Sequence, residues 1–94
     1  DLGASPGGWT WVLAKLCKEV IAIDRSVLDE RVMCQPNVQF IKKDAFKVNL
    51  TDYPQVSWVF SDVVCYPDKL YDFIAGLLAH FPDKKYVFTI KFQG

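Results

Sequence analysis

Four polar side chains stand at or just after the ends of apolar segments that are short enough to be strands. They are Asp24, Asp44, Asp62 and Lys91. A carboxylate offers two acceptor oxygens, which suit vicinal hydroxyls or an exocyclic amine, and a lysine amine is a donor or, when its pKa is lowered, a base. If the fold gathers these groups, they can hold a nucleoside-like ligand beside a basic or cationic side chain.

A glycine-rich stretch at the start of the chain is a second feature that could bind a ligand. Residues 1–10 read DLGASPGGWT. Such a stretch suits a loop that leaves a strand and opens a helix, where absent side chains let a ligand approach backbone N–H groups. Its glycines are Gly3, Gly7 and Gly8, which departs from G-x-G-x-x-G and disfavours a dinucleotide relative to another nucleotide-like ligand. A plain Gly-Pro turn explains the stretch equally well when it is taken alone.

Strands and helices alternate along the rest of the sequence. Apolar, β-branched runs predict strands over residues 19–24, 38–42, 56–62 and 86–92. Helices are predicted over residues 9–18, 27–34 and 67–81, the last with an apolar face at Leu70, Phe73, Ile74, Leu77 and Leu78. Ser26 is expected to cap the second helix, and Thr10 or the loop backbone the first. Residues 47–55 are expected to form a loop with at most one helical turn.

This alternation predicts an α/β fold with a mainly parallel sheet, right-handed crossovers and helices on both faces. In open parallel sheets, ligands bind beyond the carboxyl ends of the strands, where the four polar side chains stand. Asp24 follows Gly3 by 21 residues, the spacing of an acidic residue that meets ribose hydroxyls. Asp44 can accept from an exocyclic amine while Ala45 and Phe46 bound the base. Taken singly, each carboxylate fits a cap or a turn equally well.

Length and composition limit the kind of protein. The 94 residues make one domain at most, and an α/β sheet is normally larger, so we expect a partial domain truncated at both ends. Hydrophobic residues make up 51% of the chain, which suits a folded core. The 11 basic and 11 acidic residues cancel, so no overall charge indicates a nucleic-acid or membrane partner, and no apolar run is long enough to span a membrane.

The cysteine, histidine and tryptophan residues carry little chemistry of their own. The three cysteines are scattered without a C-x-x-C spacing, which argues against a disulfide framework and against a zinc site. We therefore expect a reducing, cytoplasmic setting and no bound metal. His80 is expected at a surface helix end, and Trp11 and Trp58 are predicted to lie in the core.

Five stretches together resemble the FtsJ-type RNA ribose 2′-O-methyltransferases, in the same order and spacing. They are DLGASPGGWT, Asp24, KDAF at residues 43–46, SDVV at 61–64 and TIKFQG at 89–94. The resemblance covers the whole chain and implies a Rossmann-like methyltransferase sheet that uses S-adenosylmethionine (SAM), with residues 1–94 as a partial domain. It implies RNA as the substrate, in particular large-subunit ribosomal RNA, free or within a ribosomal subunit.

The same resemblance implies roles for individual residues. The methionine part of SAM would contact Ser5, Pro6, Gly7, Gly8 and Trp9. Asp24 would hold the ribose, Asp44 the adenine amine, and Asp62 the cofactor near its methyl group. Lys91 matches the catalytic lysine, with Asp62 as its catalytic partner.

The implied reaction makes sense of these residue types. A ribose 2′-hydroxyl is a poor nucleophile at neutral pH, whereas the sulfonium methyl is already activated, so an enzyme must mainly align them and remove a proton. Lys91 can be the base if its pKa is lowered, or it can stabilise a developing alkoxide as a cation that Asp62 orients. Both roles stay open. The family also has a lysine before the glycine loop and a glutamate after the last segment, and neither position lies within these 94 residues.

Two other functions are compatible with the sequence. A catalytically silent module could keep the SAM pocket while another domain or a partner acts. A nucleotide-dependent oxidoreductase could use the same kind of sheet, although the glycine spacing and Lys91 disfavour it. Within the methyltransferase interpretation, SDVVCYPDK resembles the cytidine enzymes and TIKFQG the uridine enzymes, which leaves the modified nucleotide open.

Overall fold

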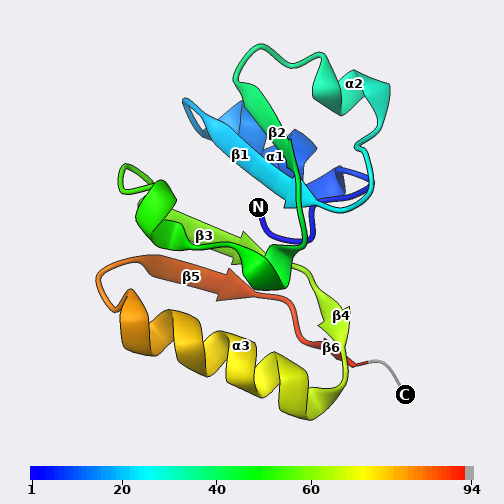
Figure 1. Ribbon diagram of the computed structural model, residues 1–94. Coiled ribbons are helices and arrows are strands. Elements are labelled where there is room, and N and C mark those ends of the chain that lie inside the picture. Colours follow the sequence, from blue (N-terminus) through cyan, green and yellow to red (C-terminus); the bar gives the residue numbers. More distant parts are fainter. Residues whose placement is uncertain (93–94) are drawn as a thin grey trace.

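A computed structural model describes the backbone of residues 1–92 and the side chains of residues 1–90. Figure 1 shows the alternation of helices and strands that the sequence predicts. In chain order the elements are α1 (Gly8–Leu16), β1 (Val20–Asp24), α2 (Glu30–Met33), β2 (Val38–Lys42), the 3-10 turns η1 (Ala45–Lys47) and η2 (Leu50–Asp52), β3 (Trp58–Ser61), β4 (Val64–Cys65), α3 (Pro67–His80), β5 (Lys85–Phe88) and β6 (Lys91–Phe92). The first two predicted strands and the longest predicted helix are confirmed to within one residue.

Parallel pairing organises the strands. β1 runs parallel to β2 with Asp24 opposite Lys42, and β3 runs parallel to β5 with Ser61 opposite Phe88. Because paired strands point the same way, their carboxyl ends reach the same edge of the sheet. The prediction of a mainly parallel sheet is therefore confirmed for the described residues.

The backbone of Leu2 joins the two strand pairs. It forms parallel bridges to Ile23 of β1 and to Ser61 of β3. Its N–H donates to the Phe60 carbonyl at 2.8 Å, and its own carbonyl accepts from the N–H of Asp62 at 3.0 Å. The start of the chain thus lies between β1 and β3, and the spatial order is β2, β1, the segment at Leu2, β3 and β5.

The end of the predicted strand over residues 86–92 differs from expectation. The chain forms β5, leaves strand geometry at residues 89–90, and then pairs again as β6 with β4, Lys91 lying opposite Val64. The N–H of Thr89 still donates to the Ser61 carbonyl at 2.9 Å, so this segment follows the chain that leaves β3. Both neighbouring segments break in the same place: β3 is followed by β4 and β5 by β6, and the partners stay paired on either side of the break. A pattern within one stretch of sequence does not reveal such a paired break.

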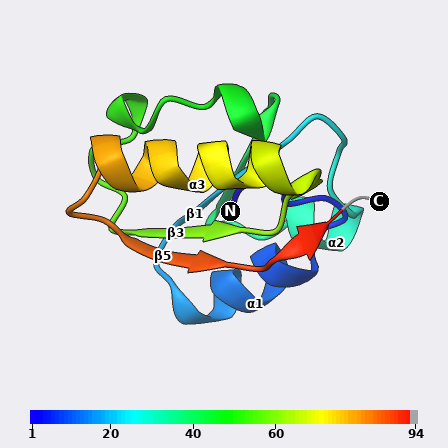
Figure 2. The same ribbon diagram turned by 90° about the horizontal axis from the view of Figure 1, so that it is seen from below.

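Helices cover both faces of the sheet, as predicted. Figure 2 shows α3 on one face and α1 on the other. The core beneath α3 is formed by Leu2, Ile23, Ala45, Leu50, Val59, Val63, Cys65, Leu70 and Leu77. A second core cluster consists of Ala4, Ala22, Leu28 and Val32. The neighbouring residues Ala22 and Ile23 belong to different clusters because successive strand side chains point to opposite faces.

The cap predicted for the second helix is wrong, and of the two alternatives given for the first helix the loop backbone is the one found. Ser26 does not cap α2: the cap is Asp29, whose carboxylate accepts from the N–H of Arg31 at 2.9 Å. Thr10 does not cap α1, because the cap position is Gly7 and the Thr10 hydroxyl donates elsewhere. The cap of α2 is local, because Asp29 stands two residues before the N–H that it accepts from, whereas the Thr10 hydroxyl bonds Asp1, nine residues earlier.

The placement of the two tryptophans in the core is also wrong. Trp58 is 52% exposed and Trp11 is 37% exposed. The pleat of β3 turns Val59 into the core beneath α3, so the preceding residue points to the other face. The Lys85 ammonium covers part of the exposed Trp58 ring, 5.3 Å from the ring centroid.

Gly3 should be required for folding. Its φ is +72°, and a Cβ there would lie 2.9 Å from Cγ1 of Val63. Gly3→Ala should therefore lower the free energy of unfolding by about 1–3 kcal/mol, measured by urea denaturation. The matched control is Gly76→Ala in α3, where a Cβ meets nothing within 4 Å and the change should stabilise the helix by about 0.5–1 kcal/mol. A Gly3→Ala midpoint equal to that of the native chain would contradict this strain argument.

Candidate functional site

The glycine loop connects the central segment at Leu2 to α1. Gly7 has a φ of +122°, and a Cβ there would lie 3.0 Å from Cγ2 of Val32, so the loop backbone approaches α2 closely. Gly8 begins α1, and a Cβ on it would meet nothing within 4 Å. The first N–H groups of a helix have no acceptor within the helix. An open, positively polarised backbone surface therefore lies at the start of α1.

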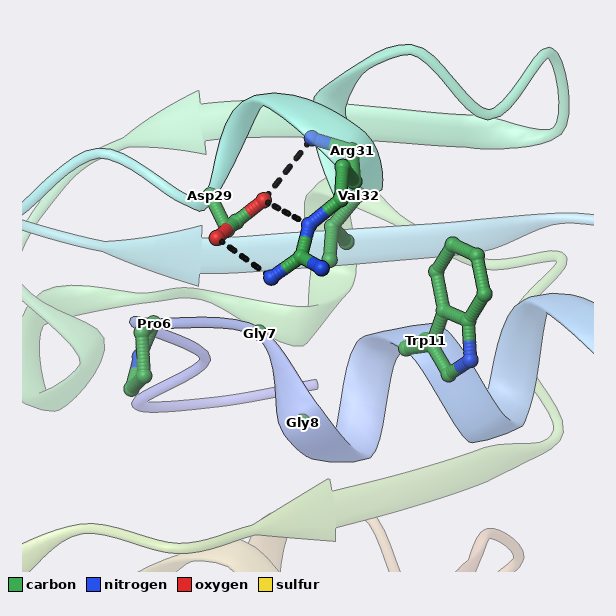
Figure 3. Close-up of a pocket in the computed structure, with 7 residues that line it drawn as sticks. All are labelled: Pro6, Gly7, Gly8, Trp11, Asp29, Arg31 and Val32. Carbon is green, nitrogen blue, oxygen red and sulfur yellow. Dashed lines mark hydrogen bonds and ion pairs between the residues drawn. The ribbon is translucent and has the colours of Figure 1, made fainter.

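A pocket of about 390 Å³ lies beside this loop. Figure 3 shows its lining residues, which are Pro6, Gly7, Gly8, Trp11, Asp29, Arg31 and Val32. The prediction placed the first three of them at a ligand site, but it did not include the residues from α2 and its cap. The sequence did carry a signal for the cap of α2. An Asp side chain such as that of Asp29 can accept from the backbone N–H two residues later and so begin a helix.

An ion pair borders the pocket. Arg31 Nε donates to Asp29 Oδ1 at 3.1 Å, and Nη2 donates to Oδ2 at 3.2 Å. These bonds and the positive charge hold the pKa of Asp29 below its usual value. Figure 3 shows the guanidinium turned toward the carboxylate. Since both charges satisfy each other, this border is less attractive to a further ion than an unpaired arginine would be.

Asp24 fastens the glycine loop to the end of β1. One carboxylate oxygen accepts from the N–H of Ser5 and the other from the N–H of Ser26, each at 2.9 Å. The Ser5 hydroxyl also donates to the carbonyl of Val27 at 3.0 Å. The predicted neighbourhood of Asp24 and the glycine loop is confirmed. Each carboxylate oxygen keeps a second lone pair, so Asp24 can still accept from ribose hydroxyls, and that role stays a prediction.

Asp44 has the structural role that the sequence also allowed, that of a residue whose side chain forms a turn. Its carboxylate accepts from the N–H of Phe46 at 3.0 Å and caps η1. The Phe46 ring packs edge-on against Phe73 at 4.9 Å, and the Lys69 ammonium lies 4.1 Å from the Phe46 ring centroid. A base bounded by Phe46 would therefore meet Lys69 as well. Recognition of an adenine amine by Asp44, and the parts of Ala45 and Phe46 in it, stay predictions.

Asp62 and Trp9 line a narrow cleft at the end of β3. The cleft is also lined by Asp1, Phe60, Ser61, Val87 and Thr89. One carboxylate oxygen of Asp62 is buried. Its backbone N–H donates to Leu2, so its position is fixed relative to the start of the glycine loop. The predicted cofactor residues are thus only partly brought together: Pro6, Gly7 and Gly8 line the larger pocket, and Trp9 and Asp62 line the cleft. Ser5, Asp24 and Asp44 line neither.

The backbone of Lys91 is placed, whereas its side chain lies outside the described part of the structure. The residue pairs with Val64, two positions after Asp62. The backbones of the two predicted catalytic residues thus lie on neighbouring segments. The role of the Lys91 amine stays a prediction.

The described part of the chain contains neither a candidate metal site nor a helix that could span a membrane. Among residues 1–90, whose side chains the structure describes, no group of three His, Cys, Asp or Glu side chains is arranged to hold a metal ion. None of the described helices is both long and apolar enough to cross a membrane. Cys17 and Cys34 are exposed free thiols, and Cys65 is a buried one.

A parallel α/β sheet with a glycine loop at its carboxyl edge is the arrangement of α/β domains in which ligands bind beyond the carboxyl ends of the strands. Residues 1–79 match the FtsJ-like methyltransferases, and the chain belongs to that family. The resemblance found in the sequence is thereby confirmed.

Several relatives carry the name ribosomal RNA large subunit methyltransferase M. The one from Azoarcus sp. (strain BH72) is 38% identical over 93 residues, which cover 97% of this chain and 24% of the relative. The one from Xylella fastidiosa (strain 9a5c) is 34% identical over 91 residues, covering 97% of this chain and 25% of the relative. The chain therefore spans about a quarter of the length of these relatives.

Removing the Asp24 carboxylate should loosen the glycine loop. Asp24→Ala leaves the N–H groups of Ser5 and Ser26 without their acceptor, so the free energy of unfolding should fall by about 1–2 kcal/mol in urea denaturation. Asp44→Ala breaks one such bond and should cost about half as much. Equal losses for the two variants would show that the bond from the Ser5 N–H to Asp24 adds no stability beyond that of the local bond from Ser26.

Proposed function

We propose that this chain is the SAM-binding and catalytic part of an enzyme that methylates a ribose 2′-hydroxyl of large-subunit ribosomal RNA. The observation that carries the proposal is the glycine loop, which Asp24 and Leu2 fix at the carboxyl edge of the sheet with Gly8 open at the start of α1. Family membership and the names of the relatives support the reaction type and the RNA substrate.

The residues present fit SAM. The open space beside Gly8 admits a ligand to the first N–H groups of α1, and such groups bind a carboxylate like that of the methionine part. We assign Ser5, Pro6, Gly7, Gly8 and Trp9 to that part. Asp24 retains lone pairs for the ribose hydroxyls, and Asp44 retains them for the adenine amine. When bound, SAM supplies an activated sulfonium methyl group.

Lys91 and Asp62 would act on the RNA hydroxyl. A lysine with a lowered pKa takes the proton from the 2′-oxygen as the methyl group is transferred. A charged lysine instead stabilises the alkoxide as it forms, with Asp62 orienting the ammonium. Both routes need the amine beside the hydroxyl, and the pairing of β6 with β4 supports this by bringing the backbone of Lys91 near that of Asp62.

The three cysteines have no disulfide in the structure, and all are free thiols. We therefore place the protein in the reducing cytoplasm, where such thiols persist. Its RNA partner would be ribosomal RNA, free or within a ribosomal subunit.

Gly8→Ala separates the ligand function of the loop from its folding. The added methyl group meets no protein atom within 4 Å, so the chain should unfold at the same or a higher urea concentration. The methyl group would obstruct a ligand at the start of α1, and the SAM dissociation constant should rise at least about tenfold in isothermal titration calorimetry. Gly76→Ala is the control and should bind SAM as the native chain does.

Two results would contradict the proposal. One is native SAM affinity in Gly8→Ala, which would remove the cofactor from the start of α1. The other is tight binding of NAD by the native chain without binding of SAM, which would favour an oxidoreductase.

Lys91 can be tested in a chimera in which this chain replaces the aligned segment of the Azoarcus relative. Transfer of labelled methyl groups from SAM to large-subunit ribosomal RNA should fall about 10²–10⁴-fold in Lys91→Ala. Arginine cannot accept a proton near neutral pH, so Lys91→Arg should fail equally if Lys91 is the base and keep part of the activity if it acts as a cation. Lys18→Ala, at an exposed site before β1, is the control. An unchanged rate in Lys91→Ala would remove Lys91 from the mechanism.

A further inference from the structure

Thr10 is buried without any exposed surface, although it is a polar residue on a helix whose neighbours are largely exposed. Its hydroxyl donates to the Asp1 carboxylate at 2.6 Å. A buried hydroxyl is costly unless it is hydrogen-bonded, and a bond to a charged acceptor is among the stronger ones. The hydroxyl makes no capping bond, since the cap position of α1 is Gly7.

The two bonded residues stand at the two ends of the glycine loop. On one side, the carbonyl of Asp1 accepts from the N–H of Ile23 at 2.9 Å, so Asp1 is fixed to β1. On the other side, Thr10 lies in the first turn of α1. The bond between their side chains therefore closes the loop at its base. The outer part of the loop is held separately, by Asp24 at Ser5 and by the Asp29 N–H, which donates to the Pro6 carbonyl at 2.8 Å.

We propose that the Thr10 hydroxyl is a positioning group that clamps the start of α1 to the sheet through Asp1, in the arrangement that binds the cofactor. The proposal rests on the SAM-binding function proposed above. Positive φ angles at Gly3 and Gly7 mark the points where the loop backbone is least restricted by side chains. Without the clamp, rotation at these glycines would let Gly8 and Trp9 shift relative to Asp24 and Asp62.

The carboxylate of Asp1 depends on the same bond. Its second oxygen, Oδ1, is buried without a hydrogen-bond partner in the structure, and the residue lines the cleft that Trp9 and Asp62 share. Loss of the Thr10 hydroxyl would leave this side chain without its one hydrogen bond from a side-chain donor. The clamp therefore also fixes one wall of the cleft.

The test compares Thr10→Val, which keeps the shape and removes the hydroxyl, with Thr10→Ser, which keeps the hydroxyl. In hydrogen-exchange measurements, the hydrogen-bonded amides of Gly3, Ala4 and Ser5 should exchange at least about tenfold faster in Thr10→Val, while those of β2 change less. Thr10→Ser should restore slow exchange. The SAM dissociation constant should rise about tenfold in Thr10→Val and return toward the native value in Thr10→Ser. If Thr10→Val does not fold, Thr10→Ala takes its place.

The readouts separate the clamp from the proposed function. Native exchange rates in the loop of Thr10→Val would overturn the clamp, whatever the SAM result. Faster loop exchange with unchanged SAM affinity would overturn its positioning role. If the native chain binds no SAM while Thr10→Val exchanges faster and Thr10→Ser does not, the proposed function fails and the clamp of the loop stands.

Discussion

The backbone pairing of Leu2 is the constraint on which the rest of the structure depends. It joins two pairs of strands that the chain otherwise leaves separate, and its side chain, only 3% exposed, belongs to the core beneath α3. The residue that follows it opens the glycine loop. The hydrogen bonds of the sheet and the packing of the core therefore fix the position of the loop. A ligand that binds there would meet a backbone that is already ordered by folding.

The carboxylates at the strand ends show how structural and ligand roles coincide. Asp24 and Asp44 accept from backbone N–H groups, as turn-forming residues do, and a carboxylate has lone pairs beyond those that such bonds use. The cap interpretation and the ligand interpretation of each residue are thus compatible. Preorganised acceptors of this kind lose little freedom on binding, because the protein holds them before a ligand arrives.

The sequence predicted those features that local patterns determine. Apolar runs marked β1 and β2, and the spacing of Leu70 and Leu77 marked α3, because burial of one face imposes that periodicity. It failed where contacts beyond the local segment decide: the bond of Thr10 to Asp1, the break between β5 and β6, and the exposure of Trp58. The cap of α2 was missed although it is local, with Asp29 two residues before the N–H that it accepts from. For the site, the resemblance indicated the loop and the acidic residues, whereas the wall from α2 arises from tertiary packing alone. The part of Lys91 stays a prediction.

The contact between Gly7 and Val32 has an evolutionary consequence. A Cβ on Gly7 would come within 3.0 Å of the Val32 side chain, so the loop and α2 share one small volume. A larger residue at position 32 would have to displace the loop backbone, and a smaller one would widen the pocket that both line. Substitutions in α2 can therefore tune the ligand cavity without changing the glycine motif.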